Sequence, residues 1–173
     1  MTTPRDAAER QLAWEIVILA EMGNRLSRKN AVGSGLHETD FRALAYIHLR
    51  TLRGQDVSPA LVGAHLSLSS AAVTYLVDRL VKAGLVERVP DPQDGRRVIL
   101  RFSKAGKTLT ETFFSDALRH HREALAQFEV ADIETTMWVL KALNDQYREY
   151  HEELSQGDAV ASSGSGARDE ASA

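Results

Sequence analysis

The chain has 173 residues, of which 43% are hydrophobic and 26% charged, and this composition excludes a mostly disordered protein. It has no cysteine, no apolar run of about 18 residues and no secretory signal at its start, which excludes disulfides, thiolate metal sites and a membrane span. We therefore expect a cytoplasmic protein without a cofactor. The net charge is −3, but residues 57–107 hold eight basic and four acidic side chains, a charge of +4 that leaves −7 for the remainder. A basic segment between acidic flanks indicates that the middle of the chain meets a polyanion.

Two helices are predicted at the start of the chain. Apolar residues recur every three or four positions in 5–29, which predicts a long helix that ends at the glycines of 33–35. Thr39 is a suitable N-cap for a second helix, which the apolar pattern extends to about Gly54.

Two shorter helices are predicted next, joined by a tight turn at Ser67. Ser58 followed by Pro59 is a typical helix start, and Ser69 provides the N-cap of the next helix. Apolar residues of that fourth helix lie at i, i+3, i+4 and i+7, and Gly84 is placed to end it. This apolar stripe consists of Val73, Leu76, Val77 and Leu80.

A β-hairpin and two long helices complete the predicted elements. Residues 85–89 and 97–102 have the composition of strands, and the Asp-Gly pair between them is typical of a hairpin turn. Ser103 and Asp132 are predicted to cap the two helices that follow. Residues 155–173 include 5 Ser, 5 Ala and 3 Gly, so we expect a disordered tail there.

Two short helices followed by a charged hairpin are the elements of a winged helix-turn-helix. The fourth helix must leave the face opposite its apolar stripe in solvent, and an exposed α-helix of this kind fits the major groove of DNA. Its first N–H groups also favour phosphate. The side chains predicted on this face are Ser70, Ala71, Thr74, Tyr75, Asp78, Arg79 and Lys82.

The combined pattern resembles the MarR (multiple antibiotic resistance regulator) family of winged-helix transcription factors. The matching stretches are Leu-Ser-x-x-x-Val-Thr-x-Leu-Val-Asp-Arg-Leu at 68–80, Lys-Ala-Gly-Leu-Val at 82–86, Asp-Pro-Gln-Asp-Gly-Arg at 91–96 and Ser-Lys-Ala-Gly at 103–106. With the long helices on either side, the resemblance covers about residues 7–154.

The resemblance implies a mainly α homodimer that binds a near-palindromic operator. Residues 5–36 and 103–154 would then form a helical dimerisation domain, and 37–102 a DNA-binding lobe with a two-stranded wing. The arginine at the tip of the wing would enter the minor groove. An acidic residue two positions before this arginine would orient the wing loop. The positions expected to contact DNA or shape the contact are Ser58, Ser69, Ser70, Ala71, Thr74, Tyr75, Arg79, Asp94, Arg96 and Arg97.

Three residues depart from the family pattern. Ser70 and Tyr75 stand where members often carry a basic residue, so the base preference is expected to differ. Ser67 stands where glycine is usual, which costs roughly 1 kcal/mol if the backbone there has φ above zero. Arg97 supplies a second charge beside Arg96, and either arginine could be the one inserted.

The resemblance also implies that a small phenolic or aromatic effector releases DNA, which makes a repressor the expected function. Trp14, Phe41, Tyr46 and His48 are candidates for its pocket, although their spacing equally suits core packing. His120 and His121 are adjacent and point about 100° apart on a helix, so we expect no metal site. No catalytic motif is recognisable, so we expect no catalytic residue and no enzyme. The alternative is a winged-helix protein-interaction module that no longer binds DNA.

Overall fold

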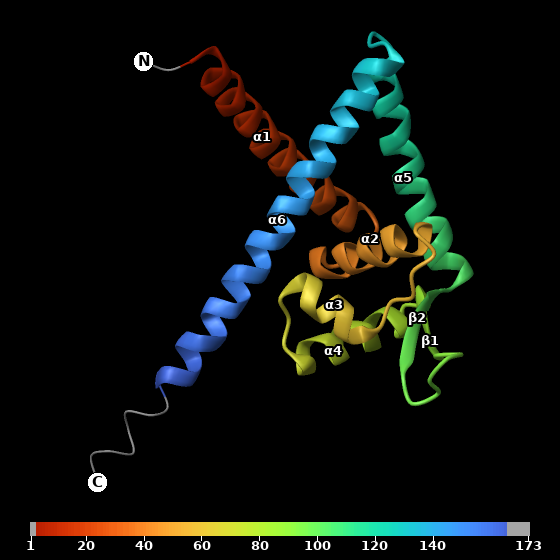
Figure 1. Ribbon diagram of the computed structural model, residues 1–173. Coiled ribbons are helices and arrows are strands. Elements are labelled where there is room, and N and C mark those ends of the chain that lie inside the picture. The colour runs from red at the N-terminus through yellow and green to blue at the C-terminus, as the bar shows by residue number, and fades with distance from the viewer. Residues whose placement is uncertain (1–2, 166–173) are drawn as a thin grey trace. The chain divides into compact units, whose positions relative to one another are not determined.

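The computed structural model describes the backbone of residues 3–165 and the side chains of residues 3–154, and shows a mainly helical chain with one two-stranded sheet (Figure 1). The described residues fall into two units, one reaching Ala117 and the other beginning at Leu118. The elements are α1 (Pro4–Gly33), α2 (Glu38–Leu52), α3 (Pro59–Leu66), α4 (Ser70–Lys82), β1 (Val86–Pro90), β2 (Val98–Phe102), α5 (Lys104–Leu125) and α6 (Val130–Ser165).

The core of the first unit lies where α2, α3, α4 and the sheet meet. Apolar side chains from all of these elements are buried together, and the stripe of α4 predicted from its spacing is fully part of this core. The backbone N–H of Leu100 in β2 donates to the carbonyl of Val57 at 2.7 Å, which ties the sheet to the segment before α3. The hairpin is therefore attached to the helical core and not only to its neighbours in sequence.

Side-chain caps begin α3 and α4 at the predicted residues. The Ser58 hydroxyl accepts the N–H of Leu61 at 3.3 Å, and the Ser69 hydroxyl accepts that of Ala72 at 3.4 Å. These hydroxyls satisfy N–H groups that have no partner inside the helix, so they fix where each helix begins.

The end of α4 is a Schellman motif around Gly84. This residue has φ +68°, a conformation that favours glycine, and its N–H donates to the carbonyl of Val81 at 2.9 Å. The N–H of Leu85 donates to the carbonyl of Leu80 at 3.0 Å, which completes the motif. The chain therefore leaves the helix in a direction that leads straight into β1.

The turn between α3 and α4 places a non-glycine residue in the left-handed region. Ser67 has φ 54° and ψ 46°, and it is the one non-glycine residue with positive φ among residues 3–165. The condition stated for this position is met, so the turn between the two helices carries a cost of roughly 1 kcal/mol.

Two predicted caps are wrong. The N-cap of α2 is His37, without a side-chain hydrogen bond, and Thr39 lies inside the helix. Two carboxylates in the first turn supply negative charge near the helix N-terminus, so a hydroxyl cap is not required there. In α6, Asp132 lies in the first turn and is not the N-cap. Its Oδ2 accepts the backbone N–H of Glu129, just before the helix, at 3.2 Å, as the third helical residue does in a capping box.

The last helix is longer than predicted. It continues past Leu154 to Ser165, across a segment expected to be disordered. A helix that is already formed propagates at small cost, and the alanines of this segment have high helix propensity. Residues 166–173, the rest of the predicted tail, lie outside the described residues.

Within residues 3–165, no single helix is both long and apolar enough to cross a membrane, and α3 with α4 reaches that composition only as a pair bent by 115°.

The sheet has the predicted antiparallel form. Val86 pairs with Phe102 and Pro90 with Val98, so the strands lie within one residue of the expected ranges. The loop between them projects beyond the helices of the lobe, as Figure 1 shows.

Candidate nucleic-acid interface

The face of α4 opposite the core is exposed. Tyr75 retains 67% of its surface, while Leu76 and Val77 retain 2% and 0%. A helix that buries one side in this way presents a continuous strip of other side chains to solvent, as insertion into a DNA groove requires. The other exposed residues of the strip are Ser70, Ala71, Thr74, Asp78 and Lys82.

The start of α4 is small and polar. Thr74 donates its hydroxyl hydrogen to the carbonyl of Ser70 at 3.0 Å, so the threonine hydroxyl is left as an acceptor. Short side chains here allow close approach of a base edge or a phosphate to the helix N-terminus.

Arg79 is held by a carboxylate from another helix. Its Nε lies 3.0 and 2.8 Å from the two carboxylate oxygens of Asp40 in α2, and its Nη2 also donates to Asp40 Oδ1. Asp40 is buried, with 2% of its side chain exposed, whereas Arg79 keeps 29%. These hydrogen bonds raise the pKa of Arg79 above its ordinary value, so the guanidinium stays charged. Nothing in the local sequence pattern around Asp40 indicates a partner 39 residues away, so this residue is not predictable from the sequence.

Tyr75 lies one turn before Arg79 on the same face of α4. The Arg79 guanidinium carbon is 5.1 Å from the centre of the Tyr75 ring, a cation–π contact. The ring of the exposed tyrosine therefore packs against a guanidinium that is itself held by Asp40.

The wing loop is shaped by two aspartates. Asp91 Oδ1 accepts the N–H of Gln93 at 2.8 Å, and Asp94 Oδ1 accepts the N–H of Arg96 at 3.1 Å. The Arg97 guanidinium lies 3.9 Å from the Asp91 carboxylate, whereas Arg96 is exposed and makes no ion pair with any residue of the described side chains. The structure therefore leaves Arg96 as the more available of the two cations.

Ion pairs attach the wing to the helices on either side. Arg88 of β1 lies 2.6 Å from Asp78 of α4, and Arg101 of β2 lies 2.8 Å from Asp56, just before α3. Both pairs are solvent-exposed and so contribute little to stability; they link β1 to α4 and β2 to the segment before α3.

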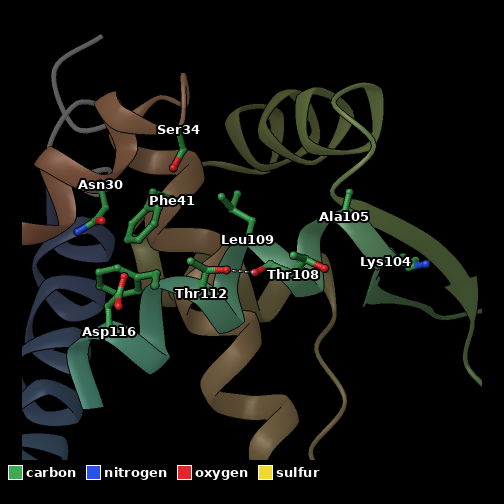
Figure 2. Close-up of a pocket in the computed structure, with 10 residues that line it drawn as sticks. Asn30, Ser34, Phe41, Lys104, Ala105, Thr108, Leu109, Thr112 and Asp116 are labelled. Atoms are coloured by element: carbon green, nitrogen blue, oxygen red, sulfur yellow. Dashed lines mark hydrogen bonds between the residues drawn. The ribbon is translucent and has the colours of Figure 1, made fainter. Parts of the chain in front are cut away.

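A cavity of about 750 Å³ lies between the end of α1, α2 and the first turns of α5. Figure 2 shows Phe41 facing the α5 residues Leu109 and Thr112, with Asn30 and Ser34 from the α1 side. Phe113 completes an edge-to-face pair with Phe41 at 4.9 Å between ring centres.

The four predicted pocket residues do not meet in one cavity. Only Phe41 lines the cavity of Figure 2. Trp14 is 66% exposed on α1, Tyr46 stacks on His65 at 4.0 Å, and His48 stacks on a phenylalanine of α5 at 4.4 Å. Helical spacing identified apolar faces correctly but could not say which neighbour each face packs against.

The two short helices, the exposed face of the second and the charged hairpin together define a winged helix-turn-helix protein. Residues 34–97 match the sequence profile of the MarR family. The multiple antibiotic resistance protein MarR of Escherichia coli K12 is 26% identical over 131 residues, which cover 73% of this chain and 91% of that relative. The chain is therefore similar to the MarR family, whose profile matches its winged-helix lobe, and the curated relatives that it resembles are transcriptional regulators.

Other relatives and solved structures are similar along most of their length. The transcriptional activatory protein BadR of Rhodopseudomonas palustris is 27% identical over 143 residues, covering 74% of this chain and 82% of the relative. The crystal structure of S. aureus MepR in its DNA-binding conformation superposes with a TM-score of 0.61 at 16% identity, covering 78% of this chain and 97% of that one. Apo wild-type E. coli MarR gives a TM-score of 0.53 at 24% identity, covering 76% and 96%.

Proposed function

We propose that this protein is a dimeric, sequence-specific repressor that releases its operator when a small aromatic or phenolic effector binds. The observation that carries the proposal is the exposed strip of α4, which lies on the same lobe as a wing with an unpaired arginine at its tip. A major-groove helix and a minor-groove cation on one rigid lobe are the two elements that read a half-site.

The roles at the interface follow from position and chemistry. The N-termini of α3 and α4, at Ser58 and Ser69, suit phosphate oxygens because their N–H groups and helix dipoles point outward. Base edges would meet Ser70, Ala71 and Thr74, whose short side chains allow close approach. The remaining contacts would come from Tyr75 on α4 and from Arg96 and Arg97 on the wing, with Asp94 shaping the loop.

A dimer is supported by apolar surface that the single chain leaves uncovered. Leu19 and Val32 of α1 are 66% and 81% exposed, and Met137 and Tyr147 of α6 are 62% and 56% exposed. Clusters of large exposed apolar side chains on a folded domain mark an interaction surface. A second copy covering these helices would place two lobes on one face of the duplex, about 34 Å apart.

The effector would occupy the cavity beside Phe41. Its lining combines aromatic and aliphatic surface with a few polar groups, including Asn30 and Thr112, which suits a small aromatic molecule that carries a hydroxyl or carboxylate. A ligand that binds best at one spacing of the two lobes shifts the population toward that spacing, and DNA is lost if the spacing does not match two half-sites.

The proposal is tested by selecting bound fragments from genomic DNA with the purified protein, followed by anisotropy titrations of the selected duplex. We expect one enriched near-palindromic sequence, binding that weakens steeply with salt, and a dimer by light scattering. Transcription from the selected promoter should fall when the protein is added and recover with a phenol or benzoate that also raises the protein's Tm. A monomer, or equal affinity for scrambled DNA, would overturn the proposal, and increased transcription would make the protein an activator.

A further inference from the structure

The ion pair between α2 and α4 removes Arg79 from the set of mobile side chains at the DNA-facing surface. Two of its three guanidinium nitrogens donate to Asp40, whose carboxylate is almost completely buried. If Arg79 turned outward to a base, it would leave that carboxylate buried without its partner, which is strongly unfavourable. Arg79 therefore stays with Asp40 when α4 approaches DNA.

This fixed guanidinium determines where Tyr75 lies. The ring is 5.1 Å from the Arg79 carbon, and residues four apart on a helix lie on the same face. Since the cation does not move, the attractive contact restricts the rotamers of the tyrosine above it. Tyr75 nevertheless keeps 67% of its surface exposed, so the ring is both oriented and available.

A tyrosine that is ordered before binding is well suited to reading a base pair. Its ring edge can contact a thymine methyl group, and its hydroxyl can donate to or accept from a base edge. An ordered side chain also loses less conformational entropy on binding than a mobile one, so more of the contact is retained as affinity. Lys82, the other basic residue of the strip, has no ion pair among the described side chains and is a flexible point charge suited to phosphate.

We propose that Tyr75 determines base preference at one position of each half-site, and that Asp40 and Arg79 are positioning residues that act through Tyr75 without reading DNA themselves. This proposal rests on the DNA-binding function proposed above. It assigns to Arg79 a role different from the base or phosphate contact that its place on α4 alone would indicate.

The experiment measures base preference by selecting bound sequences from a randomised duplex library, with the wild-type chain and with variants. The wild-type selection tests the proposed function, because a protein that does not read DNA enriches no sequence. The variants test the present proposal only after an enriched site is found. Tyr75→Ala removes the ring, Arg79→Lys keeps the charge but loses the planar fork, and Asp40→Asn keeps the shape of the carboxylate without its charge.

We expect Tyr75→Ala to reduce discrimination by about tenfold at one base pair of each half-site. Arg79→Lys and Asp40→Asn should reduce discrimination at the same base pair, and Arg79→Lys should have no further effect in a Tyr75→Ala background. Arg88→Lys is the matched control, because Arg88 also pairs with an aspartate, Asp78 of α4, but supports no ring. It should leave the preference unchanged.

Two results would overturn the proposal. One is loss of discrimination by Arg79→Lys at a base pair that Tyr75→Ala leaves intact, which would make Arg79 a direct reader. The other is an unaltered preference in Tyr75→Ala. Circular dichroism at the titration temperature establishes that each variant is folded, and Tyr75→Ala tests the proposal even if the Asp40 and Arg79 variants unfold, because its side chain lies outside the core.

Discussion

Gly106 lies directly against the carbonyl group of Leu85, so that a Cβ atom on residue 106 would stand 1.9 Å from the carbonyl oxygen. This contact joins the first turn of α5 to the start of the hairpin. The hydroxyl of Ser103 strengthens the same junction, since it accepts the N–H of Gly106 at 3.0 Å and donates to the carbonyl of Gly84 at 2.5 Å.

We therefore expect Gly106→Ala to lower the free energy of unfolding by about 3 kcal/mol, because a backbone carbonyl cannot move aside as a side chain can. Thermal unfolding of the wild-type chain and of the variant, at the same protein concentration, measures this loss of stability. The control is Gly23→Ala, since nothing lies within 4 Å of a Cβ at residue 23. That change should be neutral or stabilising by up to about 1 kcal/mol. Equal effects of the two substitutions would contradict the close approach.

Breaking the buried ion pair should destabilise the first unit. Asp40→Ala removes a buried carboxylate and leaves the partly exposed Arg79 guanidinium without its partner, and we expect a loss of about 2 kcal/mol in the free energy of unfolding. Asp78→Ala removes an exposed pair with Arg88 and should cost less than about 1 kcal/mol. Urea denaturation measures the free energy of unfolding of both variants. A smaller loss for Asp40→Ala than for Asp78→Ala would show that the buried pair contributes no more to stability than the exposed one.

The two wing arginines should differ in their contribution to operator binding. Arg97 lies 3.9 Å from Asp91, whereas Arg96 is free to enter a groove. We expect Arg96→Ala to weaken operator affinity by about tenfold or more, a loss of about 1.4 kcal/mol, and Arg97→Ala to weaken it less. Anisotropy at one fixed salt concentration provides the comparison. A larger loss for Arg97→Ala would make Arg97 the inserted side chain.

Local and distant features differ in how well the sequence predicts them. Ser58, Ser69 and Gly84 were assigned correctly because a cap or a helix end depends on a few neighbouring residues and on φ. Asp40 is not predictable in this way, because its partner Arg79 lies on another helix, 39 residues away, and Asp40 itself belongs to no local motif. Of the four residues predicted for an effector pocket, Phe41 alone lines the cavity of Figure 2, because an apolar stripe does not specify what covers it.

Two histidines should make stability depend on pH. Burial lowers the pKa of His48, an effect that the charge of Glu111 opposes, and burial together with Arg42 lowers the pKa of His65. The two imidazoles therefore take up protons at a higher pH in the unfolded chain than in the folded chain. Their contribution to the free energy of unfolding is fully present above about pH 6.5 and is lost as the pH falls below that value.

We expect the Tm to decrease from pH 7 to pH 5, and the decrease to be smaller in a His48→Phe, His65→Phe variant. His37→Gln is the control, because this histidine is exposed at the start of α2. An undiminished decrease in the double variant would assign the pH dependence to other groups.

The left-handed residue in the helix-turn-helix offers a way to stabilise the lobe. Ser67→Gly removes the contact between Cβ and the following carbonyl at φ 54° and should raise the free energy of unfolding by up to about 1 kcal/mol. Ser67→Val should lower it by more than 1 kcal/mol, because a β-branched side chain tolerates this conformation poorly. Chemical denaturation distinguishes the two directions, and destabilisation by glycine would indicate that the serine hydroxyl has a role of its own.

The base of the wing is joined to the rest of the lobe through Val57, Asp56 and Asp78, while the described hydrogen bonds and ion pairs of its loop at 91–97 stay within that loop. Adding or deleting residues in that loop would consequently change the reach of the tip and leave the strands in register. The length of the hairpin can thus vary independently of the rest of the lobe, which makes it the natural place to retune this regulator toward a wider or narrower groove.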